Sequence, residues 1–396
     1  MLDKLGMTSV FIYTFFMVST FSTAGSNLAC ALLIIVALWK IKKSKDYTVR
    51  IPGYVWKTGF ILFVPLFVAA FIHGDAESIH LTIRYFYKAL MIIPIYWALN
   101  YFRGKNAVLW GLVAGSWVHI GLSLYQGYTQ GWNYRVTGAF GSANSMPMIF
   151  ELTLPFLIIS MWELLRERKQ TKLSLVTVGV GIITVLFIFL VMLLAASRGS
   201  FLALGITAIL IVGSILCTSG VALAKKHTYR LIGLVLLGVL IVGSLPLMGK
   251  SYERHYDNER ILLLESSYHM WDDHKWVGIG LANWQKEYKS HYMSPKAKEP
   301  NLSFPHNMVA HFFAMTGTVG GVGFLAFISS TIILAFKGIK KQQHNLWLWG
   351  GVYSLFSIYL HGMVDVGIIN RDIFNMYILV LGIMASTYTN HLNQSK

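Results

Sequence analysis

Charged residues and cysteine are scarce in this sequence. Asp, Glu, Lys and Arg together make up 13% of the 396 residues, about half of the share of roughly 25% that is typical of soluble domains. The two cysteines, Cys30 and Cys217, both lie inside apolar runs, so the sequence predicts no disulfide framework and no cysteine metal site. A chain of separate soluble domains is therefore excluded, and an integral membrane protein is indicated.

The motifs of several enzyme classes are absent as well. The chain has no P-loop, no His-Glu-x-x-His zinc motif and no Asp-x-Asp of the type that binds a metal with a nucleotide sugar, since Asp272 and Asp273 are adjacent. The pair Gly278 and Gly280 lies outside any βαβ unit, so it is a weak indication of nucleotide binding. No repeat of about 20–50 residues and no matching pair of interrupted helices is present, which argues against a secondary transporter. We expect neither a metal ion nor an organic cofactor.

Long apolar runs are what the sequence has instead. Hydrophobic residues make up 55% of the chain, and the mean hydropathy is +0.56. A transmembrane helix needs ~20 apolar residues, so we expect an all-α polytopic membrane bundle of about 12 transmembrane helices. Residues 24–27 join the first two runs as a tight hairpin; the alternative, a signal peptide cut after Ala24, has a poor n-region. The predicted spans are residues 7–22, 24–41, 54–72, 82–101, 107–127, 146–164, 173–196, 200–219, 230–248, 306–336, 346–364 and 372–390.

The basic residues are unevenly distributed along the chain. Lys and Arg number 33 against 17 Asp and Glu, an excess that suits nucleic acid, anionic lipid or an anionic substrate. Most of them fall in loops that alternate with loops poor in Lys and Arg, so the positive-inside rule places these loops and both termini in the cytoplasm. No nucleic-acid partner is expected. The basic loops are residues 40–57, 101–106, 165–172, 224–230 and 337–344.

Five cations stand apart from those loops, each at or inside the outer end of a predicted helix: Arg84, Lys88, Arg135, Arg198 and Arg371. Lys88 lies on an otherwise apolar half-helix and would be costly there without an anionic partner. Arg135 lies in a glycine-containing turn that could bind a phosphate oxygen, although an ordinary connection between helices is the alternative. Arg198 lies in a short break between two spans, where it either snorkels to headgroups or faces the bundle interior.

A long polar loop, residues 249–305, separates spans 1–9 (residues 1–248) from spans 10–12 (residues 306–396). We predict a partly helical periplasmic loop, in which Arg260 either pairs with Asp257 or binds substrate.

The polar loop ends in a histidine at the mouth of a membrane helix. His306 follows Pro305, and an imidazole in that place can meet a substrate and exchange a proton near neutral pH. The alternative is a helix cap or a hydrogen-bonded core residue. Farther along, His361 and Asp365 lie at the outer end of the eleventh predicted span, where they could orient that histidine. His306 is therefore our first candidate for chemistry.

These motifs, taken in order, resemble the O-antigen ligase and polymerase superfamily of polytopic glycan transferases. The ligase branch is marked by His, then Asn, Ser or Gln, nine residues, Gly, two residues, and Gly, Thr or Tyr. His306, Asn307, Gly317 and Gly320 fit that pattern without a gap. The resemblance covers roughly residues 130–325 and also includes Arg135-Val-Thr-Gly-Ala-Phe-Gly141, Ser197-Arg-Gly199, Asp257-x-x-Arg260, His274-x-x-Val-Gly-Ile-Gly280 and Pro305-His-Asn307.

The resemblance implies an activity and a set of site residues. It implies metal-independent, inverting transfer of a glycan from an undecaprenyl-diphosphate carrier to a lipid A-core acceptor, at the periplasmic face of a bacterial inner membrane. Arg198 and Arg260 would hold the diphosphate and stabilise its charge. His306 would position or deprotonate the acceptor hydroxyl, a role usually worth ~10²–10⁴-fold in rate. The further substrate-binding residues would be Arg135, Lys88, Asn307, Asp365 and His361.

Two other functions compete with this one. A polysaccharide polymerase or a glycan-to-protein transferase of the same superfamily would use the same donor with another acceptor. A transporter of the lipid-linked glycan would need no catalytic histidine, so His306→Ala would leave its function largely intact.

Overall fold

The chain forms a bundle of helices with a smaller helical lobe at one end. The computed structural model describes residues 2–45, 53–73, 75–102, 104–166, 171–218, 255–341, 345–365 and 367–394, of which the side chains of 54, 212–218, 255–257, 341 and 389–394 are not described. Within these ranges the secondary structure is entirely helical. The predicted ninth span, residues 230–248, and the basic loop 224–230 lie outside the described residues.

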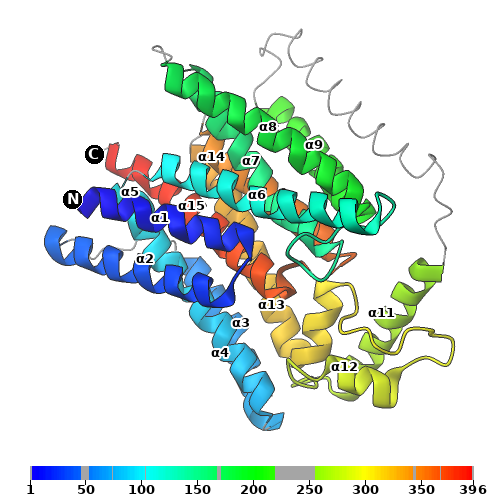
Figure 1. Ribbon diagram of the computed structural model, residues 1–396. Coiled ribbons are helices and arrows are strands. Elements are labelled where there is room, and N and C mark those ends of the chain that lie inside the picture. The colour runs from blue at the N-terminus through cyan, green and yellow to red at the C-terminus, as the bar shows by residue number, and fades with distance from the viewer. Residues whose placement is uncertain are drawn as a thin grey trace.

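The helices, which Figure 1 labels, run in the following order. They are α1 (Leu2–Ser19), α2 (Thr23–Ser44), α3 (Gly53–His73), α4 (Ala76–Leu90), α5 (Ile92–Phe102), α6 (Lys105–Gln130), α7 (Ser145–Arg166), α8 (Lys172–Ala195), α9 (Arg198–Thr218), α11 (His255–Asp273), α12 (Trp284–Glu287), the π-helix η3 (Tyr288–Tyr292), α13 (Met308–Lys341), α14 (Leu346–Gly362), the 3-10 helix η4 (Gly367–Ile369) and α15 (Arg371–Gln394).

The prediction of an all-α, multi-pass membrane protein is confirmed by these helices. Six of them, α2, α3, α6, α7, α8 and α13, are long and apolar enough to cross a bilayer. The count of twelve spans stays a prediction. One predicted span, residues 82–101, is divided into α4 and α5 at Met91. Pro94 explains the division, because a proline removes the N–H that would bond to the carbonyl of Leu90 and its ring clashes with that carbonyl.

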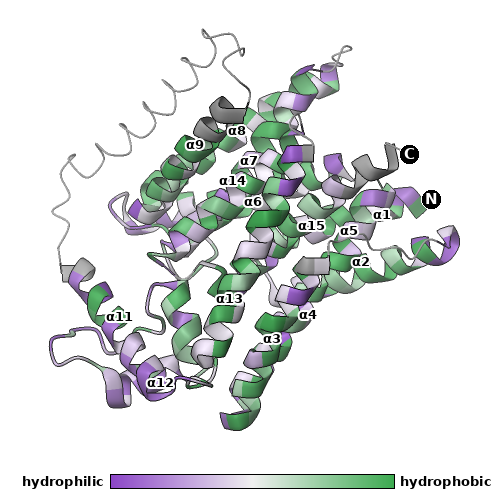
Figure 2. Cartoon of the chain, turned by 180° about the vertical axis from the view of Figure 1, so that it is seen from behind, coloured by the Kyte–Doolittle hydropathy of each residue, from purple (hydrophilic) through white to green (hydrophobic). Residues whose placement is uncertain are grey.

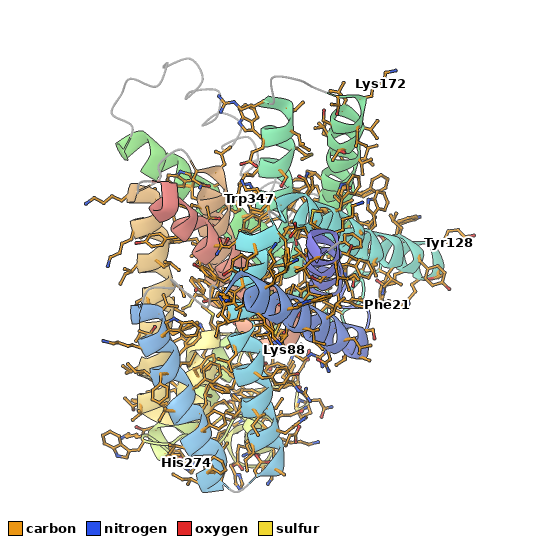
Figure 3. All side chains as sticks on the ribbon, turned by 90° about the vertical axis from the view of Figure 1, so that its left-hand side faces the viewer. Phe21, Lys88, Tyr128, Lys172, His274 and Trp347 are labelled. Carbon is orange, nitrogen blue, oxygen red and sulfur yellow. The ribbon has the colours of Figure 1, made fainter. Side chains whose placement is uncertain are left out.

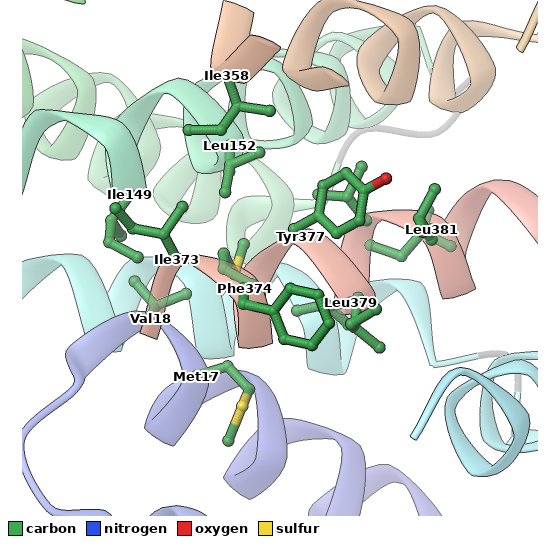
Figure 4. Close-up of a cluster of buried hydrophobic side chains, with 14 of the residues drawn as sticks. Met17, Val18, Ile149, Leu152, Ile358, Ile373, Phe374, Tyr377, Leu379 and Leu381 are labelled. Carbon is green, nitrogen blue, oxygen red and sulfur yellow. The ribbon is translucent and has the colours of Figure 1, made fainter. Parts of the chain in front are cut away.

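Helix α15 lies at the centre of the bundle. Residues 373–386 are all buried, as expected for a helix that is covered on every side. Figure 4 shows side chains of α1, α7, α14 and α15 meeting in this core, among them Met17, Ile149, Ile358, Phe374 and Tyr377. Around α15, helix α1 packs closely on α6, because Gly111 and Gly115 of α6 admit Thr14 and Val18 of α1 where a Cβ would lie only 2.6 Å away.

The lobe is built from α11, α12 and η3, which belong to the predicted polar loop. Figure 2 shows that it is more hydrophilic than the bundle, and Figure 1 shows that it lies away from the start of α1 and the end of α15. Its small core includes Leu263, Met270, Trp284 and Tyr288, which pack with Ala314 and Met315 of α13. The loop is thus partly helical, as expected, and it is anchored on the bundle through α13.

A break inside α13 receives the lobe. Gly317 has φ +63°, and an added Cβ would lie 2.4 Å from the carbonyl carbon of Trp276. The carbonyls of Ala314 and Met315, freed by this break, accept hydrogen bonds of 3.0 Å from the backbone N–H groups of Ile279 and Gly280. The segment Gly278–Gly280 therefore makes a backbone contact between the lobe and the bundle. Gly317 is the point at which α13 breaks, and not only a glycine that allows close helix packing.

Candidate active site

His306 lies in the turn that leads into α13. Its backbone has φ +51°, a left-handed conformation that costs a non-glycine residue of order 1–3 kcal/mol. Its Nδ1 lies 3.3 Å from Oδ1 of Asp365, which is buried, whereas a quarter of the imidazole surface is exposed. A proton on Nδ1 donated to this carboxylate leaves Nε2 with a lone pair that can accept a proton. The pair therefore has the arrangement of an oriented general base.

A chain of hydrogen bonds extends from this pair to the end of α8. The Nδ2 amide of Asn144 donates to Oδ2 of Asp365 at 2.8 Å, and Oδ1 of Asn144 accepts from Nη2 of Arg135 at 2.8 Å. Arg135 also donates to the carbonyl oxygen of Ala195 at 3.0 Å, which satisfies a carbonyl at the C-terminus of α8. Arg135 thus holds two segments together. Asn144, which the sequence analysis did not single out, links them to Asp365.

Asn307 caps α13. Its Oδ1 accepts a hydrogen bond of 2.9 Å from the backbone N–H of Ala310, and its Nδ2 donates to the carbonyl oxygen of Met363 at 2.8 Å. These bonds fix the His306 turn against the residues that precede Asp365. A helix cap was the alternative role that the sequence analysis considered for His306. In the structure the cap of α13 is the next residue, Asn307.

His361 belongs to a buried polar cluster that sequence analysis missed. Its Nδ1 lies 2.5 Å from Oε1 of Glu151, a fully buried carboxylate in the middle of α7. Ser200 donates to the same oxygen at 2.6 Å, and Ser357 donates to Oε2 at 2.9 Å. The signal for Glu151 was available in the sequence, because an ionisable residue within an apolar span is costly unless it is paired.

The two arginines of the predicted site lie on α9 and α11. Arg198 is exposed at the N-terminus of α9. The next residue, Gly199, packs on His361, since an added Cβ would lie 2.9 Å from Nε2 of that ring and 3.2 Å from Cγ2 of Val364. Arg260 is half-buried in α11. The turn from His361 to Asp365 therefore contacts His306, before the start of α13, and the first turn of α9, in which Arg198 lies.

Lys88 lies in a different place. It is buried in α4, and its Nζ lies 3.3 Å from Oδ1 of Asn27 and 3.7 Å from Sγ of Cys30. It lines a cavity of about 200 Å³ between α2, α4 and the start of α15. Figure 3 shows Lys88 beside α2, between the labelled ends of the molecule at His274 and Lys172. Among the residues that the structure describes, the polar contacts of Lys88 are with Asn27 and Cys30 and do not include the His306 group.

The fold and this site define a multi-pass helical membrane protein in which a histidine–carboxylate pair lies before the start of α13, the helix on which the polar lobe packs. Residues 183–325 match the family model described as O-antigen ligase, and this match confirms the resemblance to the O-antigen ligase and polymerase superfamily. Comparison with curated proteins gave no match. The matched segment contains Arg198, Arg260 and His306, and the activity it indicates is that of a glycan-transferring membrane enzyme.

Proposed function

We propose that this protein is an O-antigen ligase, which transfers a glycan from undecaprenyl diphosphate to a lipid A-core acceptor at the periplasmic face of the inner membrane. The observation that carries the proposal is the 3.3 Å contact between His306 and Asp365, in a backbone conformation that is unfavourable for histidine. The O-antigen ligase match over residues 183–325 supports it, because the match includes this histidine and both arginines.

The reaction proposed is a single in-line displacement. The acceptor hydroxyl attacks the anomeric carbon of the donor glycan, and the bond from that carbon to the phosphate oxygen breaks. The hydroxyl proton passes to Nε2 of His306, while undecaprenyl diphosphate leaves with the electron pair. Because attack and departure occur on opposite faces, the anomeric configuration is inverted.

Arg198 and Arg260 are the proposed partners of the diphosphate. A guanidinium offers several N–H donors in one plane, which suits two neighbouring phosphate groups. Stabilising the charge that develops on the leaving group is the contribution of such donors to the rate.

Four other residues are proposed to position this machinery. Asp365 orients the imidazole, Asn307 caps the helix that follows it, and Arg135 ties the turn to α8 through Asn144. His361, held by Glu151, supports the first turn of α9 from which Arg198 extends.

The test is glycan transfer by purified protein in detergent, with a synthetic undecaprenyl-diphosphate donor and lipid A-core as acceptor. We expect the wild-type protein to form product and His306→Ala to lose at least ~10²-fold in rate. His291→Ala is a matched control, because His291 is an exposed lobe histidine paired with Glu287. The absence of product from wild-type protein with both substrates present would refute the ligase proposal.

The polymerase function uses the same geometry with a different acceptor. Replacing lipid A-core by a second lipid-linked glycan in the same assay separates the two enzymes. Product formed only with the second lipid-linked glycan would assign a polymerase. The transporter function predicts flipping of the donor that His306→Ala does not alter.

A further inference from the structure

The cavity around Lys88 is the second polar site of the described chain. It is formed by the first turns of α2, one face of α4 and the start of α15. His80, Arg84 and Lys88 are spaced four residues apart along α4, so their side chains lie on one face of that helix. The polar residues of its lining include Asn27, His80, Arg84, Lys88, Arg371 and Asp372.

The charges in this cavity do not balance. Arg84, Lys88 and Arg371 are basic side chains, whereas Asp372 is the carboxylate of the lining. Arg371 engages that carboxylate with two hydrogen bonds, Nε to Oδ1 at 3.0 Å and Nη2 to Oδ2 at 3.1 Å. Two positive charges are left over, so the cavity attracts an anion.

Burial of Lys88 makes the excess of positive charge in the cavity energetically unfavourable. The residue is 4% exposed, and its contacts are an amide oxygen of Asn27, the thiol of Cys30 and the ring of Tyr87, all neutral. Removing an ammonium group from water is energetically unfavourable when no opposite charge compensates it. An anion bound in the cavity would supply the compensation.

The rim of the cavity is apolar. Ile83 and Tyr87 of α4, which line the cavity, are 48% and 41% exposed. The cationic interior of the cavity therefore opens beside hydrophobic side chains. A ligand that fits both parts has an anionic head and an apolar body, which is the chemistry of a phosphate-bearing lipid.

The cavity adjoins the His306 site through η4. Tyr85 of α4 donates a hydrogen bond to the carbonyl oxygen of Ile369, the last residue of η4. This short helix lies between Asp365, which orients His306, and Arg371, which lines the cavity. The two sites are therefore neighbours, although they have separate cations.

We propose that this cavity binds a phosphate group of a membrane lipid, separately from the diphosphate assigned to Arg198 and Arg260. Two sources carry the same chemistry, an anionic phospholipid and a phosphorylated glycolipid acceptor. Assignment to the acceptor rests on the proposed function, whereas lipid-phosphate binding does not.

The experiment is native mass spectrometry of the full chain in detergent, with no donor present. The probes are phosphatidylglycerol, lipid A, dephosphorylated lipid A, diacylglycerol and inorganic phosphate. We expect phosphatidylglycerol or lipid A to bind, and diacylglycerol and dephosphorylated lipid A to bind at least about tenfold more weakly, because they lack the charged group. Preference for lipid A over phosphatidylglycerol identifies the acceptor as the source, and the reverse identifies a phospholipid.

Two variants test the residues. Lys88→Gln and Arg84→Gln should each weaken lipid binding by about tenfold or more. Lys105→Gln is the matched control, because Lys105 is exposed and pairs with Glu163 at 3.4 Å, and its lipid binding should equal that of wild type. Lys88→Met separates loss of binding from loss of folding. It replaces a buried charge by an apolar side chain of similar length, so the melting temperature should stay unchanged while lipid binding is lost.

Unchanged lipid binding in both Lys88→Gln and Arg84→Gln would overturn the proposal, as would equal binding of diacylglycerol. Binding of inorganic phosphate with no gain from the lipid tails would overturn the assignment to a lipid. These results are independent of glycan transfer, so a protein without transferase activity could still bind the lipid, and failure here would leave the His306 reaction unaffected.

Discussion

Replacing Asp365 by asparagine tests the orientation of His306 without changing the shape of the side chain. Asp365 accepts two hydrogen bonds, one from Nδ1 of His306 and one from Nδ2 of Asn144. An asparagine keeps one carbonyl oxygen, which can accept from Asn144, and turns its NH₂ group toward the imidazole. His306 then has to accept at Nδ1 and carry its proton on Nε2. In that tautomer it cannot take a proton from the acceptor hydroxyl.

The magnitude follows from the role assigned to the base. Loss of general-base catalysis costs ~10²–10⁴-fold, so the rate of transfer by Asp365→Asn should fall by that factor. The donor KM should change little, because Asp365 is proposed to act through His306 and not on the diphosphate.

The assay is the initial rate of glycan transfer in detergent, with the melting temperature as a check on folding. Asp273→Asn is a matched control, because Asp273 is an exposed lobe carboxylate that accepts from Tyr292 at 2.9 Å. A folded Asp365→Asn variant with the wild-type rate would refute the assignment of His306 as a base oriented by this carboxylate.

Four further predictions concern Arg198, Glu151, Gly317 and Asp75. Arg198→Ala should lose most turnover and Arg198→Lys should recover part of it, because lysine keeps the charge but not the planar donors; equal rates for Arg198→Ala and wild type would contradict this. Glu151→Ala should lower the free energy of unfolding by about 3–5 kcal/mol, measured by denaturation, because it removes one partner of a buried pair. Gly317→Ala should destabilise by more than ~1 kcal/mol, because φ is positive and the added Cβ has no room; an unchanged melting temperature would argue against the break. The hydrogen bond from Ser78 lowers the pKa of Asp75, the cap of α4, so its stabilisation should be full above about pH 4 and be lost as pH falls through the lower folded-state pKa; a pH-independent difference between wild type and Asp75→Ala would contradict this.

Hydropathy was enough to predict the class of fold. Runs of apolar residues indicate helices that cross or fill a membrane bundle, and no tertiary information is needed to recognise them. The division at Met91 was not predicted, because the apolar character continues across it. Pro94 was the signal that argued for a break, and hydropathy alone does not register a proline.

The candidate site was predicted in part. The resemblance selected His306, Arg198 and Arg260, and their joint action on one substrate stays a prediction. Asn144 and Glu151 were missed because an amide in a loop and one carboxylate in an apolar helix acquire their importance from partners more than 200 residues away. Such pairings depend on how the helices pack, which a single sequence does not contain.

The partner of Lys88 could not be predicted from the sequence for the same reason, because it depends on how the helices pack. The position of this lysine in an apolar half-helix predicted a cation in need of an anionic partner, and in the structure its contacts are with the neutral groups of Asn27, Cys30 and Tyr87. Which partner depends on α2 and α15, since Asn27 and Arg371 come from helices far from α4 in the sequence. The sequence therefore indicated the charge, and the tertiary structure indicates its cavity.

A structure of the protein with the undecaprenyl-diphosphate donor bound would test the central claim most directly. The account predicts that phosphate oxygens lie about 2.7–2.9 Å from guanidinium nitrogens of both Arg198 and Arg260, with the anomeric carbon on the side of His306 Nε2. A diphosphate that contacts neither arginine, with its glycan directed away from His306, would contradict it.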